Sequence, residues 1–444
     1  MILNTNPLSK PGRTTLSGVP EGLDGLVLAD IAAGTPMPVI HVARDDKRLA
    51  LLAEMLAVFS PDLPVLPFPA WDCLPYDRVS PNSDVASARV KALGNLAIRG
   101  AGDAPLVILT TVSAILQRIP PARQFADTVF RARKGSTLDL AAMTRFMTAN
   151  GYNRTSTVRE SGEYAIRGGI IDIFPSGFDA PCRLDLFGDD IERLRRFDPL
   201  TQRSESDMDE LVLQPVSELF LNEASIGRFR GGYRDCFGAI DNDPLYDSVS
   251  AGIKAIGAEH WLPLFYDHLE TLFDYVPQAT MTFDHQVEDT IDARFQVIAD
   301  FYDARVSFLE ASRASTSKTA PPYRPLLPDQ LYLTADEWEN SILARATGWF
   351  SPFSTPGRVE GVGNNIDVAG RRSPEFATTR VEAESDERIT PSTVFDAVRD
   401  YIRGERRLGR RTAIAAFTVG SRDRLARVLE EHGLGNLQPV DNWP

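Results

Sequence analysis

Short apolar runs alternate with segments of helical periodicity over the first 120 residues. Runs at 38–42 (PVIHV), 63–68 (LPVLPF) and 106–112 (LVILTTV) predict buried strands. Apolar residues recur at helical spacing over 45–59 and 85–100. Because strands that alternate with helices usually form parallel sheets with both faces covered, this part predicts an α/β fold.

The pattern changes after residue 120. A helix is expected over 134–152, and runs rich in strand-forming residues, separated by turn signals, follow at 163–177 and 182–199. These residues predict a small α+β unit inserted between two parts of a larger domain. Residues 216–345 read as mainly helical and apolar, with one long amphipathic helix over 289–311.

The last hundred residues differ again in composition. Gly, Pro, Asn and Arg are frequent over 351–376, which predicts a flexible linker. A strand is expected over 410–419, followed by a helix that Ser421 caps and Gly433 stops. No closing strand follows this helix, so the sequence is expected to end inside its last domain.

Composition narrows the class of protein. The chain has 444 residues, a net charge of -14, 43% hydrophobic and 24% charged residues, which indicates about three globular units. No run of eighteen apolar residues and no signal peptide is present, so we expect a cytoplasmic protein without a membrane partner. Three distant cysteines, Cys73, Cys182 and Cys236, argue against a disulfide framework and structural zinc. The acidity does not suggest a protein that grips DNA by its phosphates.

The segment GVPEGLDG has the glycine spacing of a phosphate-binding loop. A working loop reads GxxxxGK[ST], in which the lysine reaches the phosphates and the hydroxyl holds magnesium. Aligned on Gly18, with Gly22 inside the loop, the segment has Leu23 at the second glycine, Asp24 at the lysine and Gly25 at the hydroxyl position. A carboxylate at the lysine position would repel phosphate, so the residues favour a loop that binds no nucleotide.

No other set of residues predicts catalysis. The five histidines are scattered, and no HExxH, GxSxG or DxDxDG pattern appears. No pair of carboxylates stands out for general acid–base work. The sequence therefore predicts no catalytic residue and no metal site.

Alternation along CRLDLF predicts a strand with one core face and one exposed face. The core face would carry Cys182, Leu184 and Leu186, and the exposed face Arg183, Asp185 and Phe187.

Arg167 follows another strand-like run and precedes Gly168, where a bulge could re-aim it. Arginine and aromatic side chains often anchor protein interfaces, so Arg167, Arg183 and Phe187 are candidate partner contacts. The same pattern also allows a half-buried phenylalanine, with arginines that only pair with Asp185 and Asp189.

Several stretches resemble one known family. GEYAIRGGIIDIFPSG and PCRLDLFGDDIERLRRFDPLTQRS resemble the UvrB-homology module of the bacterial transcription-repair coupling factors, the Mfd family. WDCLPYDRVSPNSDVASARVKAL, EHWLPLFY and RPLLPDQLYL resemble flanking segments of the same family, so the resemblance covers nearly the whole chain. It implies a degenerate RecA-like (P-loop NTPase-like) domain in two segments, 1–124 and 216–345, with an inserted UvrA-binding α+β domain at 125–215. A linker at 346–375 and a partial small α/β domain at 376–444 complete the expected organisation.

The resemblance also implies residue roles. In this family, arginines and a phenylalanine of the insert contact the excision-repair protein UvrA, and the matching residues are Arg167, Arg183 and Phe187. The related protein UvrB has an intact phosphate loop and a long DNA-clamping hairpin. Here Asp24 replaces the loop lysine, and YDRVSPNSDVASARV leaves no room for the hairpin. The module is therefore expected neither to hydrolyse ATP nor to read damaged DNA, and it is expected to need no cofactor.

The implied function is recruitment of UvrA to stalled RNA polymerase in transcription-coupled nucleotide excision repair. RNA polymerase, double-stranded DNA, ATP and magnesium would be bound by domains that are expected to follow residue 444. Two alternatives remain: an ATP-dependent helicase or translocase, and a structural module that only restrains a motor. ATP turnover would mark the first, and a lack of UvrA binding would mark the second.

Overall fold

The computed structural model describes residues 8–100, 103–126, 128–240, 242–314, 323–354, 364–376, 391–416 and 418–440. The chain forms two compact units, residues 1–369 and 370–444. Within the described ranges, no helix combines the length and the apolar character that crossing a bilayer requires. All three cysteines, Cys73, Cys182 and Cys236, are free.

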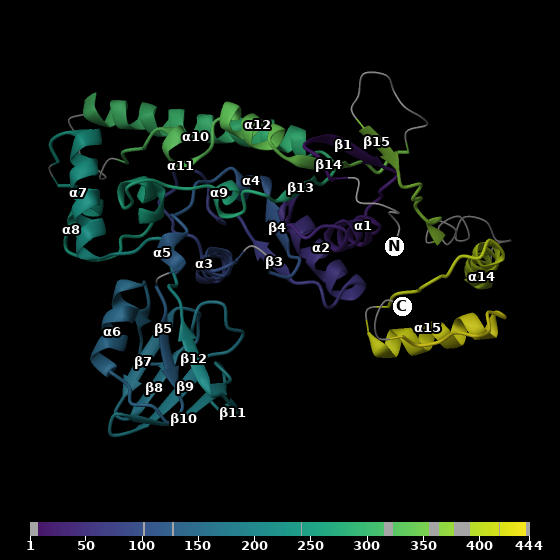
Figure 1. Ribbon diagram of the computed structural model, residues 1–444, viewed down its shortest axis with the longest axis horizontal. Coiled ribbons are helices and arrows are strands. Elements are labelled where there is room, and N and C mark those ends of the chain that lie inside the picture. Colours follow the sequence, from purple (N-terminus) through teal and green to yellow (C-terminus); the bar gives the residue numbers. More distant parts are fainter. Residues whose placement is uncertain are drawn as a thin grey trace. The chain divides into compact units, whose positions relative to one another are not determined.

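A seven-stranded parallel sheet organises the first unit (Figure 1), in the order β15-β1-β14-β13-β2-β4-β3. Its strands are β1 (Gly12–Ser17), β2 (Val39–Ala43), β3 (Val65–Phe68), β4 (Val107–Thr111), β13 (Thr280–Phe283), β14 (Ala346–Phe350) and β15 (Asn364–Asp367). The three strands predicted from apolar runs correspond to β2, β3 and β4. Their parallel pairing confirms the predicted α/β class.

Two apolar layers cover the faces of this sheet. Along β2, Ile40 and Val42 join one layer, whereas Val39 and Ala43 join the other. Helices of the first layer are α3 (Ser83–Ala97), α4 (Val112–Ile115) and α10 (Val287–Ala314), and those of the second are α1 (Asp24–Ala33) and α2 (Asp46–Phe59). Because both faces are buried, the central strands read as nearly continuous apolar runs.

Four strands of the sheet were not predicted. β1 (GRTTLS) and β15 (NNID) are polar, and they pair through backbone hydrogen bonds, which leave no trace in hydrophobic periodicity. β13 lies in a region expected to be mainly helical. The linker expected over 346–375 contains both β14 and β15, so this part of the segment belongs to the sheet.

Further helices lie between the insert and β13, and between β13 and β14. They are α7 (Glu223–Phe237), α8 (Pro244–Ser250), the 3-10 helix η1 (Ala258–Leu264), α9 (Leu272–Tyr275), α11 (Pro328–Leu331) and α12 (Ala335–Leu343). The long helix expected over 289–311 is α10, which is longer than predicted by a few residues at each end.

A smaller α+β insert lies between α5 (Arg123–Ala126) and α7. Its main sheet has the order β11-β10-β9-β8-β7-β6, and β12 pairs with β5 in a second sheet. The elements are β5 (Phe130–Arg133), α6 (Leu140–Ala149), β6 (Asn153–Arg154), β7 (Glu163–Arg167), β8 (Ile170–Ile173), β9 (Cys182–Phe187), β10 (Asp190–Phe197), β11 (Ser204–Asp207) and β12 (Glu210–Leu213). Met143 and Met147 of α6 pack against Ile171 and Leu184, so the helix closes one face of the main sheet.

Helix α3 contacts the insert through Ser87. Its Oγ accepts the N–H of Gly177 at 3.0 Å and the hydroxyl of Ser161 at 2.9 Å. The hydroxyl of Ser176 donates to the carbonyl oxygen of Ser87 at 3.1 Å. These bonds attach the β8–β9 connection to the part of the chain that builds the parallel sheet.

The second unit contains α14 (Pro391–Arg407) and α15 (Val419–Glu431), which share a cluster of Ile402, Leu429 and Leu434. The strand expected over 410–419 is not formed by residues 410–416, because none of the described residues pairs with them. Residue 417 lies outside the described ranges.

The cap of α15 also differs from the prediction. Thr418, not Ser421, is the N-cap, and its hydroxyl accepts the N–H of Ser421 at 3.1 Å. Ser421 completes a reciprocal capping box from the third helical position. Gly433 has a φ of +81° just beyond the helix end, as predicted for the residue that stops it.

Candidate functional site

Two hairpins of the insert place the three candidate partner contacts on one face of the main sheet. The β7–β8 hairpin pairs Arg167 with Ile170, and the β9–β10 hairpin pairs Phe187 with Asp190. Gly168 opens the first turn with a φ of +60°, the backbone that glycine adopts most readily. The bulge expected there is therefore wrong: the two glycines form a regular two-residue turn.

Strand register aligns these side chains in rows across the sheet. One row contains Ala165, Asp172 and Arg183, which are neighbours on β7, β8 and β9. The next row contains Arg167, Ile170 and Asp185. Phe187 follows at the end of β9, so arginines, an apolar side chain and an aromatic ring share one face.

Asp172 connects the two candidate arginines. Its carboxylate is fully buried. Oδ1 accepts Nε of Arg183 at 2.6 Å, and Oδ2 accepts Nη2 of Arg183 at 2.9 Å and also Nη2 of Arg167. Hydrogen bonding to Asp172 raises the pKa of Arg183 above its ordinary value. The expected alternative partners, Asp185 and Asp189, are not used by these arginines; Asp185 pairs with Arg195.

The three candidates differ strongly in exposure. The side chain of Arg183 is 16% exposed, and its guanidinium lies 4.6 Å from the centre of the Phe197 ring. Arg167 is 49% exposed. Phe187 is 80% exposed, so the alternative of a half-buried ring is wrong. Ile170, 39% exposed in the row next to Phe187, adds apolar surface to the same face.

Sequence reasoning missed Asp172 and Ile170. Alternation in IIDI already places Asp172 opposite Ile171 and Ile173, on the face away from the core. What the sequence did not provide was the register between β8 and β9, which sets Asp172 directly across from Arg183. An acidic residue within an apolar strand was the available signal.

The glycine-rich loop lies between β1 and α1, the strand–loop–helix context that a phosphate loop occupies. Gly18 and Gly22 have φ values of +66° and +101°. A Cβ on Gly18 would lie 2.7 Å from Oδ1 of Asp367, so the loop packs tightly against the C-terminal end of β15. Leu23 is the N-cap residue of α1, and its side chain makes no capping hydrogen bond.

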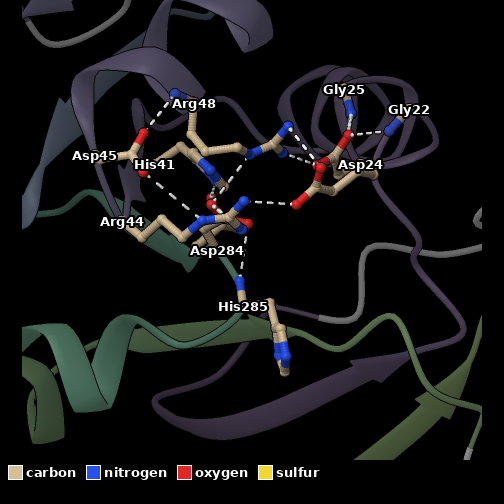
Figure 2. A network of polar contacts seen from close by, with 11 residues as sticks. Gly22, Asp24, Gly25, His41, Arg44, Asp45, Arg48, Asp284 and His285 are labelled. Carbon is tan, nitrogen blue, oxygen red and sulfur yellow. Dashed lines mark hydrogen bonds and ion pairs between the residues drawn. The ribbon is translucent and has the colours of Figure 1, made fainter.

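Asp24 fills this loop with the chain's own carboxylate (Figure 2). Its Oδ1 accepts the N–H of Gly22 at 3.0 Å and the N–H of Gly25 at 2.9 Å. Its Oδ2 accepts Nη2 of Arg48, which reaches in from α2. Amides of this kind cradle phosphate in a working loop. In this chain they are bonded to an internal anion.

A buried network surrounds Asp24 and Arg48. Nε of Arg48 donates to Oδ2 of Asp284 at 3.3 Å, and Nη1 of Arg44 approaches the same oxygen at 3.4 Å. Arg44 also donates to Glu21 at 2.7 Å. Burial raises the pKa of Asp24 above its ordinary 3.8, against the opposing effects of Arg48 and the two backbone N–H groups.

Gly25 stands where a working loop needs a hydroxyl. The space beside it is filled by the side chain of Met55. A Cβ at this position would lie 2.8 Å from Cε and 3.0 Å from Cβ of Met55 in α2. A larger residue at this position would require the Met55 side chain to shift. His41 lies nearby in β2, and burial lowers its pKa to about 4, so it is neutral at physiological pH. Among the residues that the structure describes, no group of three His, Cys, Asp or Glu side chains could hold a metal ion.

Comparison with known proteins identifies the insert. Residues 130–219 match the family model of the UvrB interaction domain. These residues run from β5 to just beyond β12, and they include Arg167, Asp172, Arg183 and Phe187.

Curated relatives match a larger part of the chain. The transcription-repair-coupling factor of Haemophilus influenzae is 33% identical over 325 residues, which cover 72% of this chain and 27% of that protein. The factor of Escherichia coli is 33% identical over 315 residues, covering 70% of this chain and 26% of that protein. The factor of Mycobacterium bovis is 29% identical over 337 residues.

The chain is therefore an α/β protein with a UvrB interaction domain. The sequence-based assignment to the N-terminal UvrB-homology module of the transcription-repair coupling factors is confirmed. The matched part spans about a quarter of the length of these relatives.

Proposed function

We propose that this chain recruits UvrA in transcription-coupled nucleotide excision repair, through the exposed face of its insert. The observation that carries the proposal is the patch of Arg167, Ile170 and Phe187 on the UvrB interaction domain. Phenylalanine and arginine are both enriched at protein interfaces, and arginine is among the residues that most often dominate binding energy. Recognition would combine apolar contact at Phe187 with charge-assisted hydrogen bonds from Arg167 to an acidic group of UvrA.

We further propose that the parallel-sheet part is a degenerate RecA-like domain that acts as a scaffold and binds no nucleotide. Asp24 supports this inference in two ways: its charge opposes phosphate, and it already accepts the loop's N–H groups. Among the described residues, no contact favours the two alternatives, a helicase or a module that only restrains a motor. Work on stalled RNA polymerase and DNA would require parts of the relatives beyond the matched quarter.

Replacing Phe187 by alanine is expected to weaken UvrA binding by about 2 kcal/mol, the threshold of a hot spot. Arg167→Ala is expected to cost about 2–5 kcal/mol if its charge is buried against a carboxylate of the partner. Isothermal titration of each variant with UvrA measures both losses. Leu200→Ala, which shortens a side chain 86% exposed in the turn after β10, is the matched control and should leave affinity unchanged. Wild-type affinity in both the Phe187 and Arg167 variants would contradict the proposed function.

The loop should show no saturable binding of ATP, with or without magnesium, in equilibrium titration. Asp24→Lys alone should not create a site, because Gly25 still lacks a hydroxyl. Asp24→Lys with Gly25→Ser should also fail, because Leu23 still occupies the position of the loop's second glycine and the serine Cβ would displace the Met55 side chain. Stoichiometric binding of ATP by the unmodified chain would contradict the scaffold assignment and revive the ATPase alternative.

A further inference from the structure

Asp172 is a fully buried carboxylate, and its side-chain partners are Arg167, a proposed UvrA contact, and Arg183, which the sequence also suggested as one. We propose that Asp172 positions Arg167 for the partner, and that Arg183 acts through Asp172 instead of contacting UvrA directly. This inference rests on the proposed function: Arg167 and Phe187 contact UvrA, whereas Arg183 and Asp172 are positioning residues.

Arg183 has little left to offer a partner. Nε and Nη2 both bond the carboxylate of Asp172, and Nη1 donates to the carbonyl oxygen of Gln202 at 3.3 Å. Its guanidinium also packs over the Phe197 ring. With three donor atoms engaged and 16% of the side chain exposed, Arg183 is built into the sheet.

Arg167 has the opposite character. It makes one side-chain hydrogen bond in the described part of the chain, from Nη2 to Oδ2 of Asp172, and half of its side chain faces solvent. A guanidinium carries five N–H groups, so several remain for a ligand. Anchoring one end of a long, flexible side chain reduces the conformational entropy that binding would otherwise remove.

These contacts form a chain of support. Phe197 is fully buried and carries the guanidinium of Arg183, Arg183 fixes both oxygens of Asp172, and Asp172 holds Arg167. Without Arg183, the buried carboxylate of Asp172 would keep only the more exposed Arg167 as its charge partner, so its position depends on Arg183. Of these four residues only Arg167 is exposed, and it lies one row from Phe187.

The test is a double-mutant cycle on the whole chain with UvrA as the titrant. Asp172→Asn keeps the size of the side chain and removes its charge, so Arg167 is no longer held by an ion pair. We expect about tenfold weaker binding, comparable to the loss of one charge-assisted hydrogen bond. In an Arg167→Ala background, Asp172→Asn should have no further effect on affinity, which a merely structural role would not produce.

Glu210→Gln is the matched control. Glu210 also bridges two arginines of the insert, Arg131 and Arg133, but it lies on β12 in the two-stranded sheet. Its replacement should leave UvrA affinity unchanged. If Asp172→Asn does not fold, Arg183→Lys takes its place: lysine keeps the charge but loses the planar fork, and it should weaken binding only when Arg167 is present.

A folded Asp172→Asn variant with wild-type affinity would overturn the inference. The inference would also be overturned if Asp172→Asn, or Arg183→Lys in its place, lowered UvrA affinity equally in the wild-type and Arg167→Ala backgrounds. If Arg167→Ala and Phe187→Ala themselves leave affinity unchanged, the proposed function is wrong, and this inference is wrong with it.

Discussion

Replacing Arg48 by methionine is expected to lower the free energy of unfolding by about 3–5 kcal/mol, the usual cost of breaking a buried ion pair by removing one partner. The carboxylates of Asp24 and Asp284 are both buried and both bond this guanidinium. Asp284 would keep a 3.4 Å approach from Arg44, but Asp24 would keep only its two backbone N–H bonds. Urea unfolding of the variant and the wild type measures the difference.

The loss should depend on pH in a definite direction. Burial already raises the pKa of Asp24 above 3.8, and Arg48 opposes that rise. A carboxyl group whose pKa is raised by folding contributes stability when it is protonated, and this contribution is lost as pH rises through the folded pKa. Removing Arg48 raises that pKa further. The destabilisation should therefore be largest near neutral pH and smaller at about pH 5.

Two comparisons separate this effect from lost packing. Asp24→Asn keeps an oxygen for the N–H groups of Gly22 and Gly25 while removing the charge, so the double variant with Arg48→Met should recover part of the stability. Arg123→Met removes a pair with Asp267 in which both side chains are more than half exposed, and it should cost less than about 1 kcal/mol. A loss of stability that stays constant from pH 5 to pH 7 would mean that Asp24 is not the group left uncompensated.

The loop illustrates which features a sequence can disclose. Spacing placed Asp24 at the lysine position, and charge alone argued against phosphate. The identity of the group that fills the site could not be predicted, because Arg48 comes from α2 and Asp284 from the end of a strand more than 230 residues further along the chain. Only the parallel order β13-β2 brings them together.

The insert shows the same division. Period-two alternation was enough to assign Cys182 and Leu184 to the core. It placed Phe187 on the opposite face but left open whether its ring is exposed or half-buried. Alternation does not report distance between strands, so Arg183 looked equivalent to Arg167. The structure separates them, since the β8–β9 register sets Arg183 against a buried carboxylate and leaves Arg167 at the hairpin end.

Strands without apolar character escaped prediction for a related reason. β1 and β15 lie at one edge of the parallel sheet, where backbone pairing and partial burial are sufficient to hold them. Strands such as β2 and β4, buried on both faces, must be apolar throughout and are therefore visible in sequence.

Arg89→Met is expected to cost about 3–5 kcal/mol as well, because it leaves the carboxylate of Glu218 buried without its charge partner. Arg89 is fully buried in α3, and it bonds both oxygens of Glu218 through Nε and Nη2. Nη1 donates to the carbonyl oxygen of Pro69 at 2.8 Å, and the guanidinium lies 4.3 Å from the centre of the Phe68 ring.

Glu218 stands where the chain returns from the insert, at the edge of the matched UvrB interaction domain. The pair therefore ties the end of the insert to the parallel-sheet part. All five tryptophans lie outside residues 130–219, and Trp71, Trp261, Trp338 and Trp349 belong to the same unit as the parallel sheet. Their fluorescence therefore does not follow the unfolding of the insert itself. The lower stability of Arg89→Met should appear in the fluorescence transition in urea.

Binding distinguishes this role from that of the exposed face. Well below its unfolding transition, Arg89→Met should bind UvrA with wild-type affinity, because Arg167 and Phe187 are untouched. Pairing it with Glu218→Gln should restore part of the stability, since the uncompensated charge is gone. Glu337→Gln, which breaks the more exposed pair with Arg118, should cost less than about 1 kcal/mol. A fluorescence transition unchanged by Arg89→Met would show that the ion pair does not stabilise this junction.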